Sequence, residues 1–276
     1  MKTSLHLPAL GLSTKDIYEN DEIAKAIMAF DGIEIGVEDG IDLAKRIRRQ
    51  SLVNARPDFL GNITMLNAIS SIENDSHTIL ANATERCVAA SEAAANVGCE
   101  KIQVYALNNF PRKSRESEKA MLAHLKDSLQ YFSSISSEFG VRLAFEPVVF
   151  SHKFPFEYIE EIIAEIGYGK VGLVLDTWHL WAMDISLETI AKLPQNAIAV
   201  VHISDAMPPK NKFHWSDLDR NQIPGKGVVP VRELIEAVRS TGYDDEWCFE
   251  LVAKHKKTDI ATLINQLSEE ISSLLL

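Results

Sequence analysis

Short apolar stretches alternate with longer amphipathic stretches along the chain, and this alternation constrains the fold more than any other feature. Strand-length stretches recur at intervals of roughly 25–45 residues. They are Thr3–Leu10, Gly32–Val37, Asn62–Ala68, Lys101–Leu107, Val141–Val148, Val171–Asp176, Ile198–Ile203 and Glu246–Val252. Helical spacing predicts helices near 14–30, 41–50, 76–97, 115–139, 155–167, 186–193, 230–241 and 258–275. Strands that alternate with helices indicate a parallel sheet with crossover helices.

Eight strand–helix units are the number that closes a (β/α)8 barrel, or TIM barrel. The 276 residues are close to the length of about 250 that is common for such a barrel. No linker rich in Pro, Gly or Ser divides the chain, so we expect one α/β domain, a single TIM barrel over residues 1–276. A doubly wound open sheet is the alternative, but no G-x-G-x-x-G follows any predicted strand.

Composition limits the partners and the compartment. The net charge of −11 disfavours binding to the phosphate backbone of nucleic acid. The apolar runs are far shorter than the roughly 18 residues that a membrane helix needs, so no membrane partner is expected. Three scattered cysteines fit reduced thiols, and the first residues lack the pattern of a signal peptide. We therefore expect a cytoplasmic protein, and the sequence leaves a homo-oligomer open.

Four consecutive predicted strands carry a polar residue at their carboxyl end: Glu146, Asp176, His202 and Glu250. Side chains alternate between the faces of a strand, and in three of the four strands the residue before the polar one on that face is small or apolar. If that face is the barrel interior, the four residues surround the C-terminal mouth, where barrel enzymes carry their chemistry. Taken singly, each has a simpler interpretation, as a solvated strand end, a helix N-cap or a hydrogen-bonded core histidine.

Three carboxylates placed close together repel one another, and burial adds to the cost. A bound divalent cation removes this conflict. Three carboxylates and one imidazole form an oxygen-rich ligand set that suits Mn²⁺, Mg²⁺, Co²⁺ or Zn²⁺. The sequence therefore predicts a site for one divalent metal ion.

The order Glu146, Asp176 with His179, His202 and Glu250 resembles the xylose isomerase-like barrel superfamily of sugar isomerases and epimerases. Within that group the chain is most similar to inosose isomerase-like proteins. The segments GLVLDTWHLWAM, VVHISDA and DLDRNQIPGKGVVPVRELIEAVRSTGYD carry the resemblance, which covers residues 141 to 252. The first half matches only in its strand rhythm and in GIEIGVEDG.

The resemblance implies that Glu146, Asp176, His202 and Glu250 hold one divalent metal ion. It also implies that Glu146 and Glu250 act as acid and base on opposite faces of a small sugar or inositol-derived substrate. The expected reaction is isomerisation or epimerisation of a keto-sugar or keto-inositol, by proton transfer through a metal-stabilised enediolate.

Further residues are candidates for substrate binding. A turn after Asp176 brings His179 over the mouth, unless it is a packed histidine between two tryptophans. Arg220 either binds a substrate oxyanion or pairs with Asp217 or Asp219 at the surface. Glu34, Asn67 and Asn108 lie at the ends of earlier strands and are candidates for contacts with sugar hydroxyls. The long segment Asp205 to Gly227 is a candidate lid. His6, His77, His124, His152, His214 and His255 lack nearby partners in the pattern and are expected to be structural or solvated.

Three other functions remain open at this point. A dehydratase of the inosose or dehydroshikimate type uses the same proton abstraction. A zinc-dependent DNA-repair endonuclease of the same superfamily is disfavoured, because Asp219-Arg220-Asn221 lacks the histidine that such enzymes need and because the charge is negative. A barrel that only binds a sugar or metal is disfavoured by the intact set of ligands.

Overall fold

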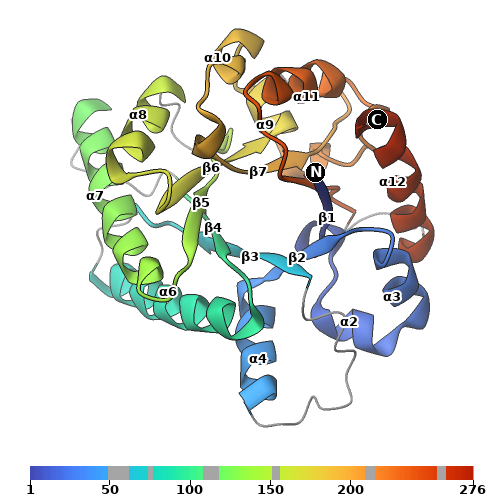
Figure 1. Cartoon of the computed structure of the whole chain (residues 1–276), viewed down its shortest axis with the longest axis horizontal. Coiled ribbons are helices and arrows are strands. Elements are labelled where there is room, and N and C mark those ends of the chain that lie inside the picture. The colour runs from blue at the N-terminus through green and yellow to red at the C-terminus, as the bar shows by residue number, and fades with distance from the viewer. Residues whose placement is uncertain are drawn as a thin grey trace.

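Eight parallel strands form a closed barrel in the computed structural model, which describes residues 1–48, 62–73, 77–107, 118–150, 156–208, 215–253 and 259–275. Each strand pairs with the next in the chain, and β1 pairs with β8 (Figure 1). This confirms the predicted (β/α)8 barrel. The strands are β1 Lys2–His6, β2 Gly32–Gly36, β3 Ile63–Ser70, β4 Lys101–Tyr105, β5 Arg142–Phe145, β6 Val171–Asp176, β7 Ile198–Ile203 and β8 Glu246–Phe249.

Helices surround the barrel and cover the outer face of the sheet (Figure 1). They are α1 Leu7–Leu10, α2 Thr14–Glu19, α3 Asp21–Ile27, α4 Val37–Arg48, α6 His77–Val97, α7 Glu118–Ser137, α8 Phe156–Ile166, α9 Thr177–Ala182, α10 Leu187–Ala191, α11 Val231–Ser240 and α12 Ile260–Leu275. Two short 3-10 helices, η1 Gln195–Ala197 and η2 Asp217–Asp219, precede β7 and follow it, respectively.

The first predicted strand was too long. Strand β1 ends at His6, because the His6 imidazole Nδ1 accepts the Ala9 N–H at 3.0 Å and caps a short helix that contains Pro8. Gly11, with φ of 76°, ends that helix in the left-handed conformation that glycine tolerates. Leu7–Leu10 was predicted as strand because it is apolar, and the capping role of His6 was not recognised.

The predicted helix over 14–30 is in fact two helices. Asn20 ends α2 and caps α3, because its side-chain oxygen accepts the N–H groups of Glu22 and Ile23. The strands β5 and β8 are also shorter than predicted, and end just before Glu146 and Glu250. The two carboxylates therefore leave the ends of their strands rather than lie within them.

The apolar core has two parts. One lies between the strands and the surrounding helices and includes Leu5, Ile35 and Leu175. The other is a separate cluster of Met65, Ala144, Val174, Ala199, Val200 and Cys248. Most of these six alternate along their strands with residues of the first part, so the second cluster fills the middle of the barrel interior.

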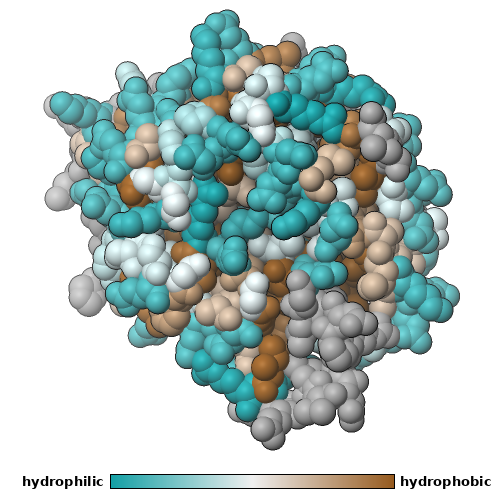
Figure 2. Space-filling view, viewed as in Figure 1, coloured by the Kyte–Doolittle hydropathy of each residue, from teal (hydrophilic) through white to brown (hydrophobic). Residues whose placement is uncertain are grey.

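On the face shown in Figure 2, polar residues predominate and apolar residues appear between them. Among the residues that the structure describes, no helix is both long and apolar enough to span a membrane.

The three cysteines are buried and unpaired, and we expect them to be unreactive in the folded protein. Burial raises the pKa of Cys87 to about 11 and that of Cys99 to about 12, and it raises the pKa of Cys248 well above its ordinary value. Since the thiolate is the reactive form, a thiol reagent at pH 8 should modify the native protein at least about 100-fold more slowly than the unfolded chain. Rapid modification of one equivalent in the native state would contradict this burial.

Candidate metal centre

The structure brings together the four residues that the sequence placed at the C-terminal mouth. One ligand atom from each of Glu146, Asp176, His202 and Glu250 lies within 4.8 Å of the ligand atoms of the other three. All four side chains are buried. Residues that are more than 100 positions apart in sequence therefore form one cluster of three carboxylates and an imidazole.

Asp176 is held by the helix that follows its strand. It is the N-cap of α9, and its Oδ1 accepts the His179 N–H at 2.8 Å. The Ser204 hydroxyl donates to the same carboxylate at 2.8 and 2.9 Å. The N-cap interpretation of a strand-terminal aspartate is thus correct for this residue, and it coexists with membership in the cluster.

His202 lies between two carboxylates. Its Nδ1 is 2.9 Å from Glu250 Oε2, and its Nε2 is 3.2 Å from both carboxylate oxygens of Glu34. Glu34 is itself oriented by the Asn67 side-chain amide, which donates at 2.7 Å. Although burial acts to lower it, the pKa of His202 is raised well above its ordinary value by Glu34 and Glu250, so without a cation both ring nitrogens donate. A cation in the cluster would take the place of the Nδ1 proton, and Glu34 would still accept the Nε2–H. This is how outer carboxylates orient the histidine ligands of metals.

The cluster carries charge that its protein partners do not fully balance. Burial and the neighbouring Glu250 raise the pKa of Glu146 well above its ordinary value, and burial raises the pKa of Asp176 to about 6 despite the nearby Arg220. Among described residues, the buried Glu146 Oε1 has no hydrogen-bond partner. A divalent cation would satisfy this oxygen and the like charges around it, so the donor set fits such an ion.

The pKa of Glu250 is shifted in the opposite direction to that of Glu146. Burial acts to raise the pKa of Glu250, but the charges of Arg220 and His6 and the hydrogen bond from His202 place it well below the ordinary value. Arg220 Nη2 lies 2.8 Å from Glu250 Oε1. The two glutamates that the sequence suggested as acid and base therefore differ in their tendency to hold a proton.

Arg220 enters the site instead of lying at the surface. It is only 6% exposed, and its Nη1 lies 3.2 Å from Asp176 Oδ2. It also pairs with Asp217 at 2.6 Å, one of the two surface partners that the sequence suggested. The guanidinium lies over the Trp178 ring, 5.3 Å from the centroid. The residue thus bridges two members of the cluster and a carboxylate at the rim.

The segment that carries Arg220 is folded around Asp205. The Asp205 carboxylate accepts N–H groups of Ala206, Gly225, Gly227 and Val229 at 2.8 to 3.0 Å. A Cβ at Gly227 would lie 2.2 Å from Asp205 Oδ1, so only glycine fits there. Lys226 points away and pairs with Glu270 at 2.8 Å. Residues 209–214 of the candidate lid lie outside the described residues.

His179 combines both roles that the sequence left open. Its Nδ1 accepts the Val149 N–H at 3.1 Å, which leaves the hydrogen on Nε2, 3.9 Å from Glu146 Oε1. Burial lowers the pKa of His179 well below its ordinary value, so the ring is neutral. The ring packs against Trp178 and Phe150, and it also lines the pocket over the cluster.

That pocket has a volume of about 350 Å³. Its walls include Asn67, His179 and Arg220 of the predicted substrate-binding residues, whereas Glu34 lies buried beneath, on His202. Asn108 lies outside the described residues.

Two residues of the site escaped the sequence interpretation. His6, expected to be structural or solvated, lines the pocket, and its ring centroid is 5.5 Å from that of His202. The Gln103 side-chain amide donates to Glu146 Oε2 at 2.7 Å and orients that carboxylate. The signal was present, because Gln103 shares a strand face with Lys101, and His6 with Ser4. His124 contacts the Glu73 backbone away from the site, and the other four histidines have no described side chain.

The closed barrel and the buried cluster at the carboxyl ends of its strands define a TIM barrel with a candidate metal centre. The chain belongs to the family described as xylose isomerase-like TIM barrel, whose sequence model matches residues 22–271. This confirms the resemblance noted in the sequence.

Two curated relatives share the name inosose isomerase. The one from Bacillus subtilis (strain 168) is 31% identical over 127 residues, 45% of each chain. The one from Halalkalibacterium halodurans is 28% identical over 142 residues, 49% of each chain. The similarity therefore spans about half the length of these relatives.

Two solved structures share the fold over nearly the whole chain. A crystal structure of IolI protein with a zinc atom has a TM-score of 0.78 at 22% identity, covering 99% of this chain and 96% of that chain. The apo form of 3-keto-D-glucoside 4-epimerase, YcjR, from E. coli has a TM-score of 0.74 at 18% identity, covering 99% of each.

Removal of Arg220 should destabilise the chelator-treated protein strongly. In Arg220→Leu, Asp176 and Glu250 lose a buried positive partner, and we expect the free energy of unfolding in urea to fall by about 3–5 kcal/mol. The matched control is Arg86→Leu, which removes an exposed pair with Glu38 and should change it by about 1 kcal/mol or less. Equal effects of the two substitutions would mean that the Arg220 pairs contribute nothing to the fold.

Proposed function

We propose that this protein is a divalent-metal-dependent isomerase or epimerase of a keto-sugar or keto-inositol. The observation that carries the proposal is the buried cluster of Glu146, Asp176, His202 and Glu250 at the floor of the 350 Å³ pocket. The names of the relatives, inosose isomerase and 3-keto-D-glucoside 4-epimerase, agree with this chemistry. The donor set supports the metal dependence.

A divalent cation held by the four residues would supply Lewis-acid polarisation of substrate oxygens, worth several kcal/mol. The chain's own residues would move the proton. Glu250 is held ionised by Arg220 and is suited to accept the proton on the carbon next to the carbonyl. Glu146, whose pKa is raised well above its ordinary value by burial and by Glu250 before a cation binds, is suited to return a proton. A pair of carboxyl groups with opposite tendencies is what acid–base exchange at one carbon requires.

Other residues would bind and orient the substrate. His179 is neutral and directs an Nε2–H donor toward Glu146 and the pocket, where a substrate oxygen would accept it. Gln103 fixes one oxygen of Glu146 and leaves Oε1 free to face the cluster. Pro8, Val148 and Phe150 form an apolar part of the wall that limits the access of water.

A dehydratase would use the same first step. Proton removal next to the carbonyl, followed by loss of a neighbouring hydroxyl, gives elimination in place of isomerisation. Analysis of the products separates the two reactions. The nuclease alternative gains no support among the described residues, where the one further cluster of ligand type, Glu34, His202 and Cys248, shares His202 with the first.

The central test measures metal content and proton exchange together. Elemental analysis of the purified protein should give about one equivalent of divalent metal, from the single four-residue cluster. With inososes and 3-keto-sugars in D₂O, NMR should show deuterium entering the carbon next to the carbonyl. Glu146→Gln and Glu250→Gln should slow this exchange by about 10²–10⁴-fold.

Glu188→Gln serves as the matched control for these two variants, because Glu188 is an exposed partner of Lys192 far from the pocket. It should exchange at the wild-type rate. No metal even after addition of Mn²⁺, or full exchange activity in Glu146→Gln, would refute the proposed function.

Glu34→Gln should weaken metal binding without removing a ligand. Loss of the carboxylate on His202 Nε2 removes the group that orients the ring and raises its basicity, and such changes typically cost about 10–100-fold in metal affinity. Competition with a fluorescent chelator measures the dissociation constant. Glu38→Gln, on the exposed side of α4, is the control and should leave it unchanged. An unchanged affinity in Glu34→Gln would exclude this orienting role.

A further inference from the structure

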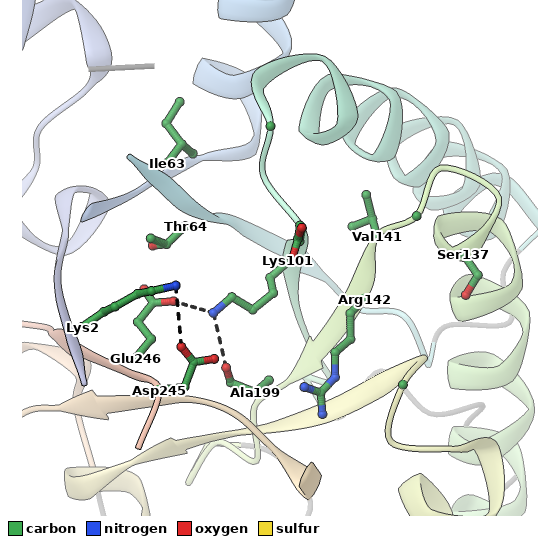
Figure 3. A pocket seen from close by; sticks show the side chains of 14 residues that line it. Lys2, Ile63, Thr64, Lys101, Ser137, Val141, Arg142, Ala199, Asp245 and Glu246 are labelled. Carbon is green, nitrogen blue, oxygen red and sulfur yellow. Dashed lines mark hydrogen bonds and ion pairs between the residues drawn. The ribbon is translucent and has the colours of Figure 1, made fainter. Parts of the chain in front are cut away.

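A second cavity, shown in Figure 3, has a volume of about 630 Å³. It lies at the opposite end of the barrel from the candidate metal centre, because it is lined by residues that begin the strands. Its wall includes the first residues of five strands: Lys2 of β1, Ile63 of β3, Lys101 of β4, Arg142 of β5 and Glu246 of β8. The cavity therefore opens at the N-terminal mouth. The apolar layer that contains Ala144, Val174 and Cys248 separates it from the metal centre.

Small residues at this level of the barrel interior leave room for long polar side chains. Bulky branched residues usually fill such interiors. Here Ala199 lines the cavity, and Gly172 faces the guanidinium of Arg142. A Cβ at Gly172 would lie 2.1 Å from Arg142 Nη2, so any larger residue would displace that guanidinium.

Lys101 is a half-buried cation with a matching anion. Its ammonium pairs with Glu246 and donates to the Ala199 carbonyl at 3.3 Å. The other carboxylate oxygen of Glu246 accepts the Ser4 hydroxyl at 2.5 Å. Although burial acts to lower it, the pKa of Lys101 is raised by the attraction of Glu246. An ammonium has three N–H donors, so one remains for a further acceptor.

Arg142 is a cation without a matching anion. It is the register partner of Lys101 on the neighbouring strand, so both side chains enter the same cavity (Figure 3). Its Nη2 donates to the Asn196 carbonyl at 2.8 Å, and its buried Nε has no acceptor. No carboxylate among the described residues lies within ion-pair distance, and burial lowers the pKa of Arg142. The wall also carries Lys2, Glu100 and Asp245, so its formal charges balance overall. The Arg142 guanidinium nevertheless has no ion pair, and its Nε lacks an acceptor that an anionic ligand would supply.

We propose that this cavity binds a small hydroxy-carboxylate that carries a single negative charge, through Arg142 and the free donor of Lys101. The ligand's carboxylate would pair with the Arg142 guanidinium, because the planar set of N–H donors of a guanidinium matches the two oxygens of a carboxylate. The hydroxyl groups would donate to Asp245 and accept from Thr64 and Ser137, which line the same cavity. Asp245 and Glu246 would repel a second negative charge, so the wall selects against dianions. The volume is within the range of small-molecule sites.

Isothermal titration calorimetry with gluconate tests this assignment on the full chain with its metal. Gluconate should bind at least about tenfold more tightly than neutral sorbitol or dianionic glucarate, since one charge pair worth about 1.4 kcal/mol gives that factor. Arg142→Gln should weaken gluconate binding by about tenfold or more. Glu146→Gln should leave it unchanged, because that variant alters only the other end of the barrel.

Gly172→Ala provides a second variant that keeps the arginine but displaces its guanidinium, and it should also weaken gluconate binding. Circular dichroism confirms that each variant is folded, and Gly172→Ala decides the outcome if Arg142→Gln does not fold. The assignment is overturned if gluconate does not bind, if sorbitol binds equally well, or if affinity in Gly172→Ala is unchanged. Binding that is lost in Glu146→Gln would place gluconate at the metal centre and overturn it as well.

Discussion

Closure of a parallel sheet is the constraint on which every feature of this molecule depends. In a parallel barrel all strands point the same way, so each carboxyl end reaches one mouth and each amino end the other. The register places Asp176 beside His202 and places His202 beside Cys248, two residues before Glu250. Pairing of β8 with β1 then brings His6 to the same rim. Residues from the first to the last strand meet because hydrogen bonds between backbones align them.

The cost of burying charge explains how the C-terminal mouth is built. Four carboxylates, those of Glu34, Glu146, Asp176 and Glu250, lie there almost without exposure. Arg220 and His202 provide the nearby positive or proton-donating groups. If all four carboxylates are ionised, at least two negative charges remain unmatched even with a protonated His202. A divalent cation would balance that excess charge, which a further hydrogen bond does not remove. The whole set of ligands, and not any single contact, therefore indicates a metal site.

The sequence was informative where a pattern repeats and weak where a residue acts alone. The rhythm of strands and helices predicted the barrel, and four polar residues at the ends of consecutive strands predicted the cluster. Gln103 and His6 were missed because neither belongs to the repeated pattern at the ends of the last four strands, although each shares a strand face with another polar residue. The end of β1 at His6 was missed because Leu7–Leu10 is apolar in either conformation. Arg220 shows the same limit, since its spacing from Asp217 suggested a surface pair and its burial depends on the fold of the whole loop.

The two ends of the barrel interior differ in charge balance. At the C-terminal end carboxylates exceed their cationic partners, and the site fits a divalent cation. At the N-terminal end the cavity wall carries as many carboxylates as cations, and among the described residues Arg142 has no carboxylate within ion-pair distance. A thin layer that includes Ala144, Val174 and Cys248 separates the two, and the strands β4, β5 and β8 each contribute to both ends. Lys101 and Gln103 share one face of β4, and Gln103 holds the Glu146 carboxylate that follows β5. The pleat of β4 therefore orients the candidate catalytic carboxylate at one end and places a cation at the other.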